Sequence, residues 1–375
     1  MRNSRLSLRS PDSASIIRVV STVVTSTLAV VLALAVGAIF ILLSNQNPID
    51  AYVALLEGAF GNRRAVGETL VLSSPMILGG LSFAIAARAS MFNIGIEGQI
   101  VIGSLAGGLA AAANLGVPPI VYVPLCLILG GIAGGLWGAI PGVLKAKSGA
   151  SEVIATIMLN YLAFRVSTYM VTSAGDWLSL VEPQQLGTKR ADADARLPII
   201  LDGTRLNAGF PIAIAAALLL WYLLFRTTFG YRIRTVGLSR GAAAFAGISW
   251  GATITLAMFM SGALAGVAGT IEAIGLNGRH YGAPAGYGFT AIAVGLVGRN
   301  HPLGVIFAGL LFGVLRSGST NMQSQAGASK DLILILQGLV ILAIAALAAV
   351  EHIRGRRAQK AAVTRPQQSP SGAGA

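Results

Sequence analysis

The chain has 375 residues, of which 54% are hydrophobic and 11% are charged, and its formal net charge is +13. Soluble domains carry about 25% charged residues, so this composition excludes a soluble globular protein and indicates a polytopic membrane protein. The basic residues gather at the edges of apolar segments, where the enrichment of Lys and Arg in cytoplasmic loops explains them without a nucleic-acid partner.

Apolar segments alternate with short polar ones, which predicts an all-α, polytopic transmembrane helix bundle. The first run, 19–43, is longer than the apolar core of about 7–15 residues in a signal peptide, so we expect a retained helix. The run at 288–298 is too short for a plain span, which leaves about 9–10 spanning or re-entrant segments at ~20 residues per span. The candidates lie near residues 19–43, 69–87, 96–114, 119–144, 152–173, 210–225, 251–273, 288–298, 303–318 and 331–349.

The positions of Lys and Arg set the expected orientation. With the N-terminus in the cytoplasm, most of the 27 basic residues fall in cytoplasmic loops, so we expect both termini inside the cell. The predicted parts are a basic cytoplasmic tail at 1–18, a transmembrane domain at 19–350 with an outside loop at 174–209 and a cytoplasmic loop at 226–250, and a basic, disordered cytoplasmic tail at 351–375.

Glycines recur at every fourth position in several predicted helices. Gly130, Gly134 and Gly138 fall on one helix face, and Gly262 and Gly266 repeat the spacing. In lipid, small residues let helix backbones approach closely. We therefore expect a tightly packed bundle, with a subunit interface as a further use of these faces, and not a phosphate site.

Metal, redox and enzymatic chemistry have little support in the sequence. The single cysteine, Cys126, lies in an apolar run and is interpreted as a small core residue. His280, His301 and His352 lack metal-ligand spacing. There is no nucleotide-binding Gly-x4-Gly-Lys-Ser/Thr loop and no Gly-x-Ser-x-Gly or His-Glu-x-x-His motif. We expect no enzymatic activity, no metal and no cofactor in this chain.

The most unusual stretch is residues 88–108. Asn93, Glu97 and Gln99 lie there between apolar runs, with glycines beside them. A carboxylate at membrane depth costs several kcal/mol unless it faces protein, water or a partner, and broken backbone at that depth must be buried or line a cavity. Two interpretations stay open: a re-entrant or interrupted segment beside a water-filled path, and a short polar turn between two spanning helices.

Four ordered motifs carry a resemblance to a known family. They are Phe92-Asn-Ile-Gly-Ile-Glu-Gly-Gln99, Glu152-Val-Ile-Ala-Thr-Ile-Met-Leu-Asn160-Tyr161, Phe229-Gly-Tyr-Arg-Ile-Arg-Thr-Val-Gly237 and Gly298-Arg-Asn-His-Pro-Leu-Gly304. Through them, residues 20–350 resemble the permease subunits of nucleoside-type ATP-binding cassette (ABC) importers, which are related to simple-sugar and branched-chain amino acid permeases.

The resemblance implies a function and a set of partners. The chain would translocate nucleosides across the cytoplasmic membrane of a prokaryote together with a second, paralogous permease chain and an external substrate-binding protein. ATP-Mg would be bound and hydrolysed by a separate cytoplasmic ABC ATPase. The alternatives are a permease for simple sugars or branched-chain amino acids, and an ATP-independent transporter or channel in which Glu97 and Glu272 relay protons. The outside loop would dock the external protein or act as a solvated connector.

The cytoplasmic loop at 226–250 is too charged to lie in the bilayer. Ser239 is placed as a helix N-cap before a run of small residues, which predicts a short, slim helix with Phe245 projecting. Such a helix suits a groove on a soluble partner, and the resemblance implies that it is the coupling helix that docks on the ATPase. The alternative is a basic loop held by anionic lipid. The coupling residues are Arg232, Arg234, Gly237, Ser239, Ala243, Phe245 and Gly247.

Further polar residues complete the candidate site. Asn160, beside Tyr161, lies deep in an apolar stretch and either bonds a neighbouring helix or faces a polar ligand. Glu152 lies near the start of its helix, where a carboxylate satisfies free N–H groups. Glu272 is interpreted as the partner of Arg279 or Arg316. The candidates for the translocation path or its gate are Asn93, Glu97, Gln99, Asn160 and Tyr161.

Overall fold

The computed structural model describes residues 31–327 apart from 33, 173–179, 183, 185 and 283–285, and scattered positions between 332 and 346. Two compact units are distinguished. Ile49–Ala328 is the larger and carries every site described below, and Met1–Pro48 with Ser329–Ala375 forms the smaller. The predicted tails, and most of the predicted spans at 19–43 and 331–349, lie outside the described residues, which include a helix at Leu34–Leu43.

The larger unit is built of helices, which confirms the predicted all-α polytopic bundle. Among the described residues, six helices are long and apolar enough to cross a membrane, or up to seven if Leu34–Leu43 and Pro48–Phe60 form one broken span. The six are α3 (Arg63–Arg88), α5 (Pro119–Ser148), α6 (Glu152–Thr172), α7 (Gly209–Arg226), α10 (Trp250–Ile271) with a π-helical extension at Glu272–Asn277, and α12 (Pro302–Ala326).

In the described part of the larger unit, five shorter α-helices connect or interrupt these spans. They are α2 (Pro48–Phe60), α4 (Ile96–Ala112), α8 (Thr228–Leu238), α9 (Arg240–Phe245) and α11 (Tyr287–Val297). The predicted span at 96–114 is thus a 17-residue helix, and the segment at 288–298 is an 11-residue helix. Both are shorter than the ~20 residues that a plain span needs.

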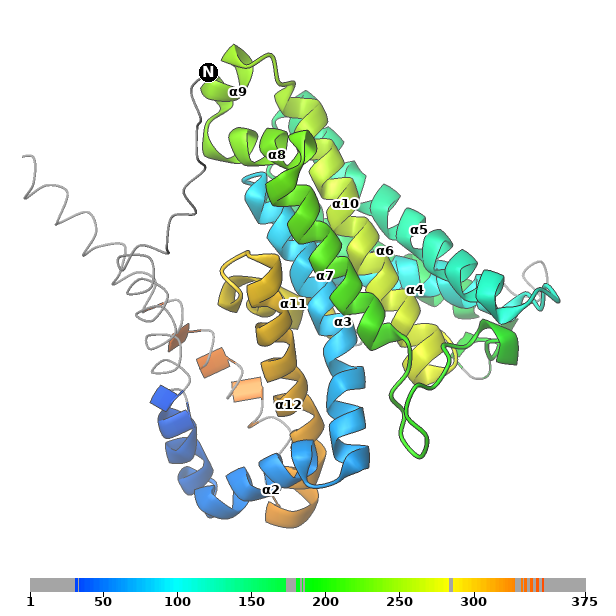
Figure 1. The fold of residues 1–375 in the computed structure, drawn as a ribbon, viewed down its shortest axis with the longest axis vertical. Helices are drawn as coiled ribbons and strands as arrows, with labels where there is room; N and C mark the ends of the chain where they lie inside the picture. The colour runs from blue at the N-terminus through cyan, green and yellow to red at the C-terminus, as the bar shows by residue number, and fades with distance from the viewer. Residues whose placement is uncertain are drawn as a thin grey trace, which may run out of the picture. The chain divides into compact units, whose positions relative to one another are not determined.

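Helix α3 is the central element of this unit. In its apolar window 83% of the residues are buried, against 22% in the corresponding window of α6. Figure 1 shows α3 running lengthwise between α7 and α12, and it also packs against α10 and α11. Since the apolar outer faces of α5 and α6 are open, they suit lipid or a second membrane subunit.

Glycine contacts hold α4, α5 and α10 together, as their spacing predicts. A Cβ at Gly134 would meet the Gly262 carbonyl oxygen at 2.5 Å and the Gly266 Cα at 2.7 Å. On the other side of α10, the Gly266 backbone lies against Gly103 of α4. The three backbones therefore approach one another directly, and this contact fixes where the polar start of α4 lies.

The described part of the predicted outside loop forms a small cap beside α4 and α6. Val181–Glu182 and Gly187–Thr188 pair as the antiparallel strands β1 and β2, with Val181 opposite Thr188. Gly187 also bridges to Tyr281, which ties the cap to the segment before α11.

Candidate functional site

The turn between α3 and α4, residues 89–95, is built around a buried asparagine. The Oδ1 atom of Asn93 accepts a hydrogen bond from the backbone N–H of Gly95 at 2.9 Å. This local bond replaces a backbone partner where the chain leaves the helical path. Ser90 has a φ of +59°, which confirms that the chain reverses there. The glycine-interrupted motif therefore forms an ordered turn and not a continuous helix.

A network of buried polar side chains links this turn to α3 and α10. The Nδ2 atom of Asn93 donates to the Gln99 Oε1 at 2.9 Å and to the Ser261 Oγ at 2.8 Å. Ser261 in turn donates to the Ser82 carbonyl oxygen at 2.7 Å. Each of these side chains is at most 1% exposed. In an apolar surrounding each unmade bond would cost ~1–3 kcal/mol, so the network specifies one arrangement of the three helices.

Asn160 of α6 holds the same turn from the opposite side. Its Oδ1 accepts from the Gly98 N–H at 2.8 Å, and its Nδ2 donates to the Ile94 carbonyl oxygen at 3.0 Å. The Gly98 N–H belongs to the first turn of α4, where helices leave N–H groups unpaired, and the Ile94 carbonyl belongs to the turn that precedes this helix. Asn160 therefore bonds a neighbouring helix, which is one of the two roles that its sequence position allows.

Glu97 joins the starts of two helices. Its carboxylate accepts hydrogen bonds from the Gly286 N–H at 2.8 Å and from the Gly288 N–H, both at the N-terminus of α11. The side chain is 1% exposed. A carboxylate at this position satisfies free N–H groups and lies at the positive end of the α11 dipole. Gly288 is required here because a Cβ would collide with the Glu97 backbone.

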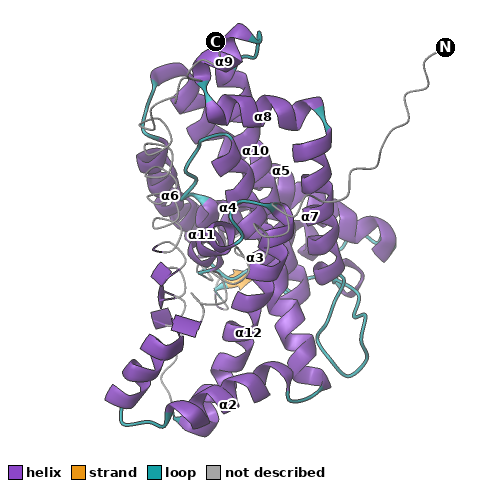
Figure 2. Cartoon of the chain, turned by 60° about the vertical axis from the view of Figure 1, so that its left-hand side comes forward, coloured by secondary structure: helices purple, strands orange, loops and turns teal. Residues whose placement is uncertain are grey.

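The two short helices thus meet at their N-termini, one from each half of the chain. Figure 2 shows α4 and α11 next to one another inside the bundle. Interrupted helices of this kind in transporters turn their N-terminal ends toward the translocation path near the middle of the membrane. Here the two ends are occupied by protein groups, so the arrangement is a closed junction between the halves.

Tyr161 is the one predicted path residue that the structure keeps apart from the others. Its side chain is 64% exposed, and its ring lies 6.5 Å from that of Phe164 on the same helix. Neighbouring residues on a helix point about 100° apart, so Asn160 and Tyr161 face different surroundings. Tyr161 lies on the outer face of α6.

Arg316 and Tyr287 belong to this region although the path prediction did not include them. The Arg316 guanidinium lies 4.1 Å from the centre of the Tyr287 ring, a cation–π contact at the first residue of α11. The charge of Arg316 also acts on Glu97 and Glu272. Glu272 accepts from the Asn277 Nδ2 at 3.2 Å. An arginine within an apolar span was the available signal, because such residues face protein or water.

Two further ion pairs involve residues that the sequence singled out for other partners. Glu152, at the start of α6, pairs with Lys145 at 2.8 Å. Arg279, one of the two partners expected for Glu272, lies 3.8 Å from the carboxylate of Glu182 in the cap that contains β1 and β2.

His280 is fully engaged between α4 and α6. Its Nδ1 lies 2.8 Å from the Ser104 Oγ, and its Nε2 lies 2.8 Å from the Ser167 Oγ. The imidazole is 2% exposed. Since both ring nitrogens have hydroxyl partners, His280 fastens the segment before α11 to the bundle. No local pattern in the sequence indicates these partners.

The predicted coupling loop forms two helices at the end of the bundle away from α2 (Figure 1). The Ser239 Oγ accepts from the Ala242 N–H at 3.2 Å and caps α9, as its position predicts. Ala243 is buried against the rest of the chain, whereas Phe245 is 98% exposed and Leu238 is 88% exposed. Gly247, with a φ of +68°, lies directly after the C-cap of α9. Helix α9 is therefore a short, N-capped helix that exposes the aromatic ring of Phe245 to its surroundings.

Helix α8 is attached to the end of α3 through a cluster of rings and guanidinium groups. Arg88 lies 5.5 Å and Arg234 lies 5.3 Å from the centre of the Phe225 ring. The imidazole of His301 packs on the same ring at 5.1 Å. Burial and the nearby Arg88 charge lower the pKa of His301, so its ring is neutral at pH 7. Gly237 lies directly against the Arg88 carbonyl oxygen.

Through this cluster the loop joins the α3–α4 turn. Arg88 is the last residue of α3, and its Nε donates to the Asn300 carbonyl oxygen at 2.9 Å. The motif at 298–304 and the motif at 229–237 are therefore held together at the residue that precedes the turn. Of the other predicted coupling residues, Arg232 is exposed on α8.

The family model described as the permease component of the branched-chain amino acid transport system matches residues 65–345. The chain is 36% identical to the guanosine ABC transporter permease protein NupP of Bacillus subtilis, over 89% of this chain and 96% of that protein. It is 36% identical to the nucleoside permease protein NupB of Lactococcus lactis, over 85% and 89% respectively.

A third relative widens the range of named substrates. The glucose ABC transporter permease protein TsgB13 of Haloferax volcanii is 32% identical, over 85% of this chain and 86% of that protein. No solved structure matches the chain. The family match covers most of the chain, including every helix from α4 to α12. The chain belongs to the family of membrane-spanning permease subunits of ABC transporters.

Proposed function

We propose that this chain is the permease subunit of an ABC importer for nucleosides. The relatives named for guanosine and nucleosides, which match at 36% identity over most of the chain, support the substrate class. The subunit would lie in the cytoplasmic membrane of a prokaryote with both termini inside. It would work with a second, paralogous permease, an external substrate-binding protein and a cytoplasmic ATPase that carries ATP-Mg.

One observation supports the energy coupling. Phe245 projects from α9 with 98% of its surface exposed, on a basic loop that leaves the apolar part of the bundle. A capped helix with one bare aromatic anchor fits a hydrophobic groove on a soluble partner. We assign this groove to the ATPase, and Arg232, Arg234, Gly237, Ser239, Ala243 and Gly247 to shaping or supporting the anchor.

Contacts inside the chain connect the proposed ATPase-docking helix α9 to the α3–α4 turn. Movement of α9 would move α8, which lies on the Arg88 backbone through Gly237. Arg88 ends α3, and the α3–α4 turn follows at once. In this proposal, closure of the ATPase shifts that turn, and the junction between α4 and α11 opens toward alternate sides of the membrane.

The polar junction then acts as a gate. Asn93, Glu97, Gln99 and Asn160 all have hydrogen-bond partners within the chain, so we assign them to holding the closed state and not to binding substrate. Tyr161, on the outer face of α6, would meet lipid or the second permease chain.

Replacing the anchor tests the coupling directly. Phe245→Ala removes a ring that would be buried in the ATPase groove, and hot-spot truncations of this kind cost about 2 kcal/mol or more, or roughly 30-fold in affinity. We expect the tagged permease, purified in mild detergent, to lose most of its bound ATPase. Tyr222→Ala on α7 is the control, because it removes a half-exposed aromatic side chain from the apolar part of the bundle. If no ATPase were recovered with the unchanged chain, the assignment as an ABC importer subunit would be refuted. If both variants retained the same amount of ATPase, Phe245 would not be the docking anchor.

A further inference from the structure

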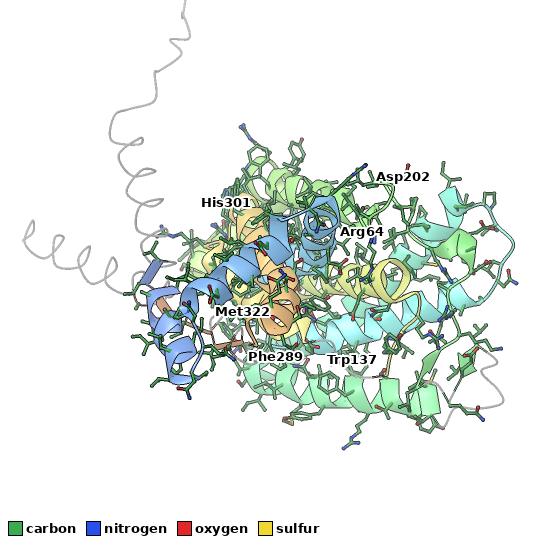
Figure 3. All side chains as sticks on the ribbon, turned by 90° about the horizontal axis from the view of Figure 1, so that it is seen from below. Arg64, Trp137, Asp202, Phe289, His301 and Met322 are labelled. Carbon is green, nitrogen blue, oxygen red and sulfur yellow. The ribbon has the colours of Figure 1, made fainter. Side chains whose placement is uncertain are left out.

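A polar cleft opens at the end of the bundle where α2 lies. Its volume is about 1030 Å³, near the upper end of the ~300–1,000 Å³ typical of ligand pockets. It lies between the end of α2, the start of α3, the tip of the loop at 203–205 and the last turns of α12. Figure 3, seen from that end, labels Arg64 on α3 near the loop that carries Asp202.

The walls of the cleft are fixed by hydrogen bonds between these elements. The Asn321 Nδ2 donates to the Ala54 carbonyl oxygen at 2.9 Å, which joins α12 to α2. The Arg64 Nε donates to the Gly203 carbonyl oxygen at 3.2 Å, which joins α3 to the loop. The cleft is therefore a formed feature of the larger unit and not a gap between loosely placed helices.

The charges in the cleft are mixed. The lining includes the guanidinium groups of Arg64, Arg205 and Arg316 and the carboxylates of Glu57 and Glu68. Arg205 and Glu68 form an ion pair at 2.9 Å. Hydroxyl and amide groups from α12 complete the surface. Because donors and acceptors of both signs are interspersed, the cleft suits an uncharged ligand with many hydrogen-bonding groups better than it suits an anion or a cation.

The position of Arg316 shows that the cleft reaches into the bundle. Arg316 lies 10 residues before the end of α12 at Ala326, or roughly 15 Å along the helix from the mouth of the cleft at 1.5 Å per residue. An arginine at such depth needs protein or water around it. Its guanidinium stacks on Tyr287 on one side, and it lines the cleft on the other.

We propose that this cleft receives the nucleoside on its way to the gate. The inference rests on the proposed function. An arginine fork matches the adjacent oxygen and nitrogen acceptors on the guanine edge, and a carboxylate is a suitable acceptor for ribose hydroxyls. Arg316 and Glu57 are the groups we assign to these two contacts.

The cleft is built for weak binding. No aromatic side chain is among its described lining residues, so base stacking, worth ~1–3 kcal/mol per base, does not contribute. A passage site must release what it takes up. Since Arg316 also stacks on the first residue of α11, a ligand that draws Arg316 into the cleft would loosen the α11 end that Glu97 holds.

Cysteine labelling distinguishes this site from the surrounding surface. Thr320 of α12 lines the cleft, and Gln323, one turn on, is exposed but does not line it. Thr320→Cys and Gln323→Cys are made in the full importer, where the native Cys126 is buried. A membrane-impermeant thiosulfonate is added from outside, with and without saturating guanosine, and guanosine uptake is then measured.

We expect both cysteines to react from outside, but only the one at 320 to react several-fold more slowly with guanosine present. Modification at 320 abolishes most uptake, and modification at 323 leaves it unchanged. Equal labelling at 320 with and without guanosine, or full uptake after modification at 320, would overturn the assignment of the cleft as a nucleoside site. Normal guanosine uptake by the unmodified importer would still support the proposed function. If leucine or ribose protects and guanosine does not, the nucleoside ligand is wrong.

Discussion

Replacing Glu97 by glutamine is expected to destabilise the permease by roughly 2–4 kcal/mol and to abolish transport. The Glu97 carboxylate accepts from the N–H groups of Gly286 and Gly288 with separate oxygens. A glutamine has one oxygen and one NH2 group, so one buried N–H would face another donor. The start of α11 would lose its attachment to α4, and the junction between the two halves would open.

The loss of stability is measured by thermal unfolding of the purified chain, with size-exclusion chromatography reporting the fraction that remains folded. Glu68→Gln is the matched control, since it removes a carboxylate from the half-exposed ion pair with Arg205. Exposed pairs of this kind contribute about 0–1 kcal/mol. If the two variants unfolded at the same temperature, Glu97 would not hold α11 and the account of the junction would be wrong.

Gly134→Ala is expected to cost about 1–3 kcal/mol or more, although alanine is the better helix former. The added Cβ would meet the Gly262 carbonyl oxygen and the Gly266 Cα and nitrogen, all of them backbone atoms. No side-chain rotation can relieve such a clash. Helices α5 and α10 would have to move apart, and α4, which packs on the same glycines, would shift with them.

Gly131→Ala on the same helix provides the comparison. Its added Cβ would approach the Val267 Cγ2 at 3.2 Å, a side-chain atom that can give way. We expect an unfolding temperature close to that of the unchanged chain. A similar loss of stability in both variants would mean that α5 tolerates no added volume anywhere, and the direct backbone contact would have no special role.

The sequence determined the helices better than the contacts between them. Apolar runs marked α5, α6, α7 and α10 within a few residues, because burial in lipid requires long apolar segments. Helix α3 begins six residues before its predicted run and α12 ends eight residues after its own, because both extensions are polar. The short run at 288–298 also indicated an interrupted helix correctly. The number of crossings made by the whole chain depends on residues outside the described part.

The partners of the polar residues could not be predicted in the same way. Glu97 contacts a helix end that lies 191 residues further along the chain, and hydropathy carries no information about that pairing. Asn160 and Tyr161 are neighbours in a motif, yet one is 3% and the other 64% exposed, because only the packing of α6 decides which face is covered. The cleft beside α2 draws its lining from three separate stretches, 57–72, 203–205 and 316–325, which no local pattern brings together.

The central claim is that this chain carries nucleosides as part of an ATP-driven importer. Uptake of labelled guanosine by cells with and without the gene for this chain, in a background that lacks other guanosine importers, tests it most directly. We expect uptake to disappear with the gene, to return with the unchanged chain but not with Phe245→Ala, and to resist excess ribose and leucine. Uptake that persists without the gene, or that ribose or leucine abolishes, would contradict the nucleoside assignment.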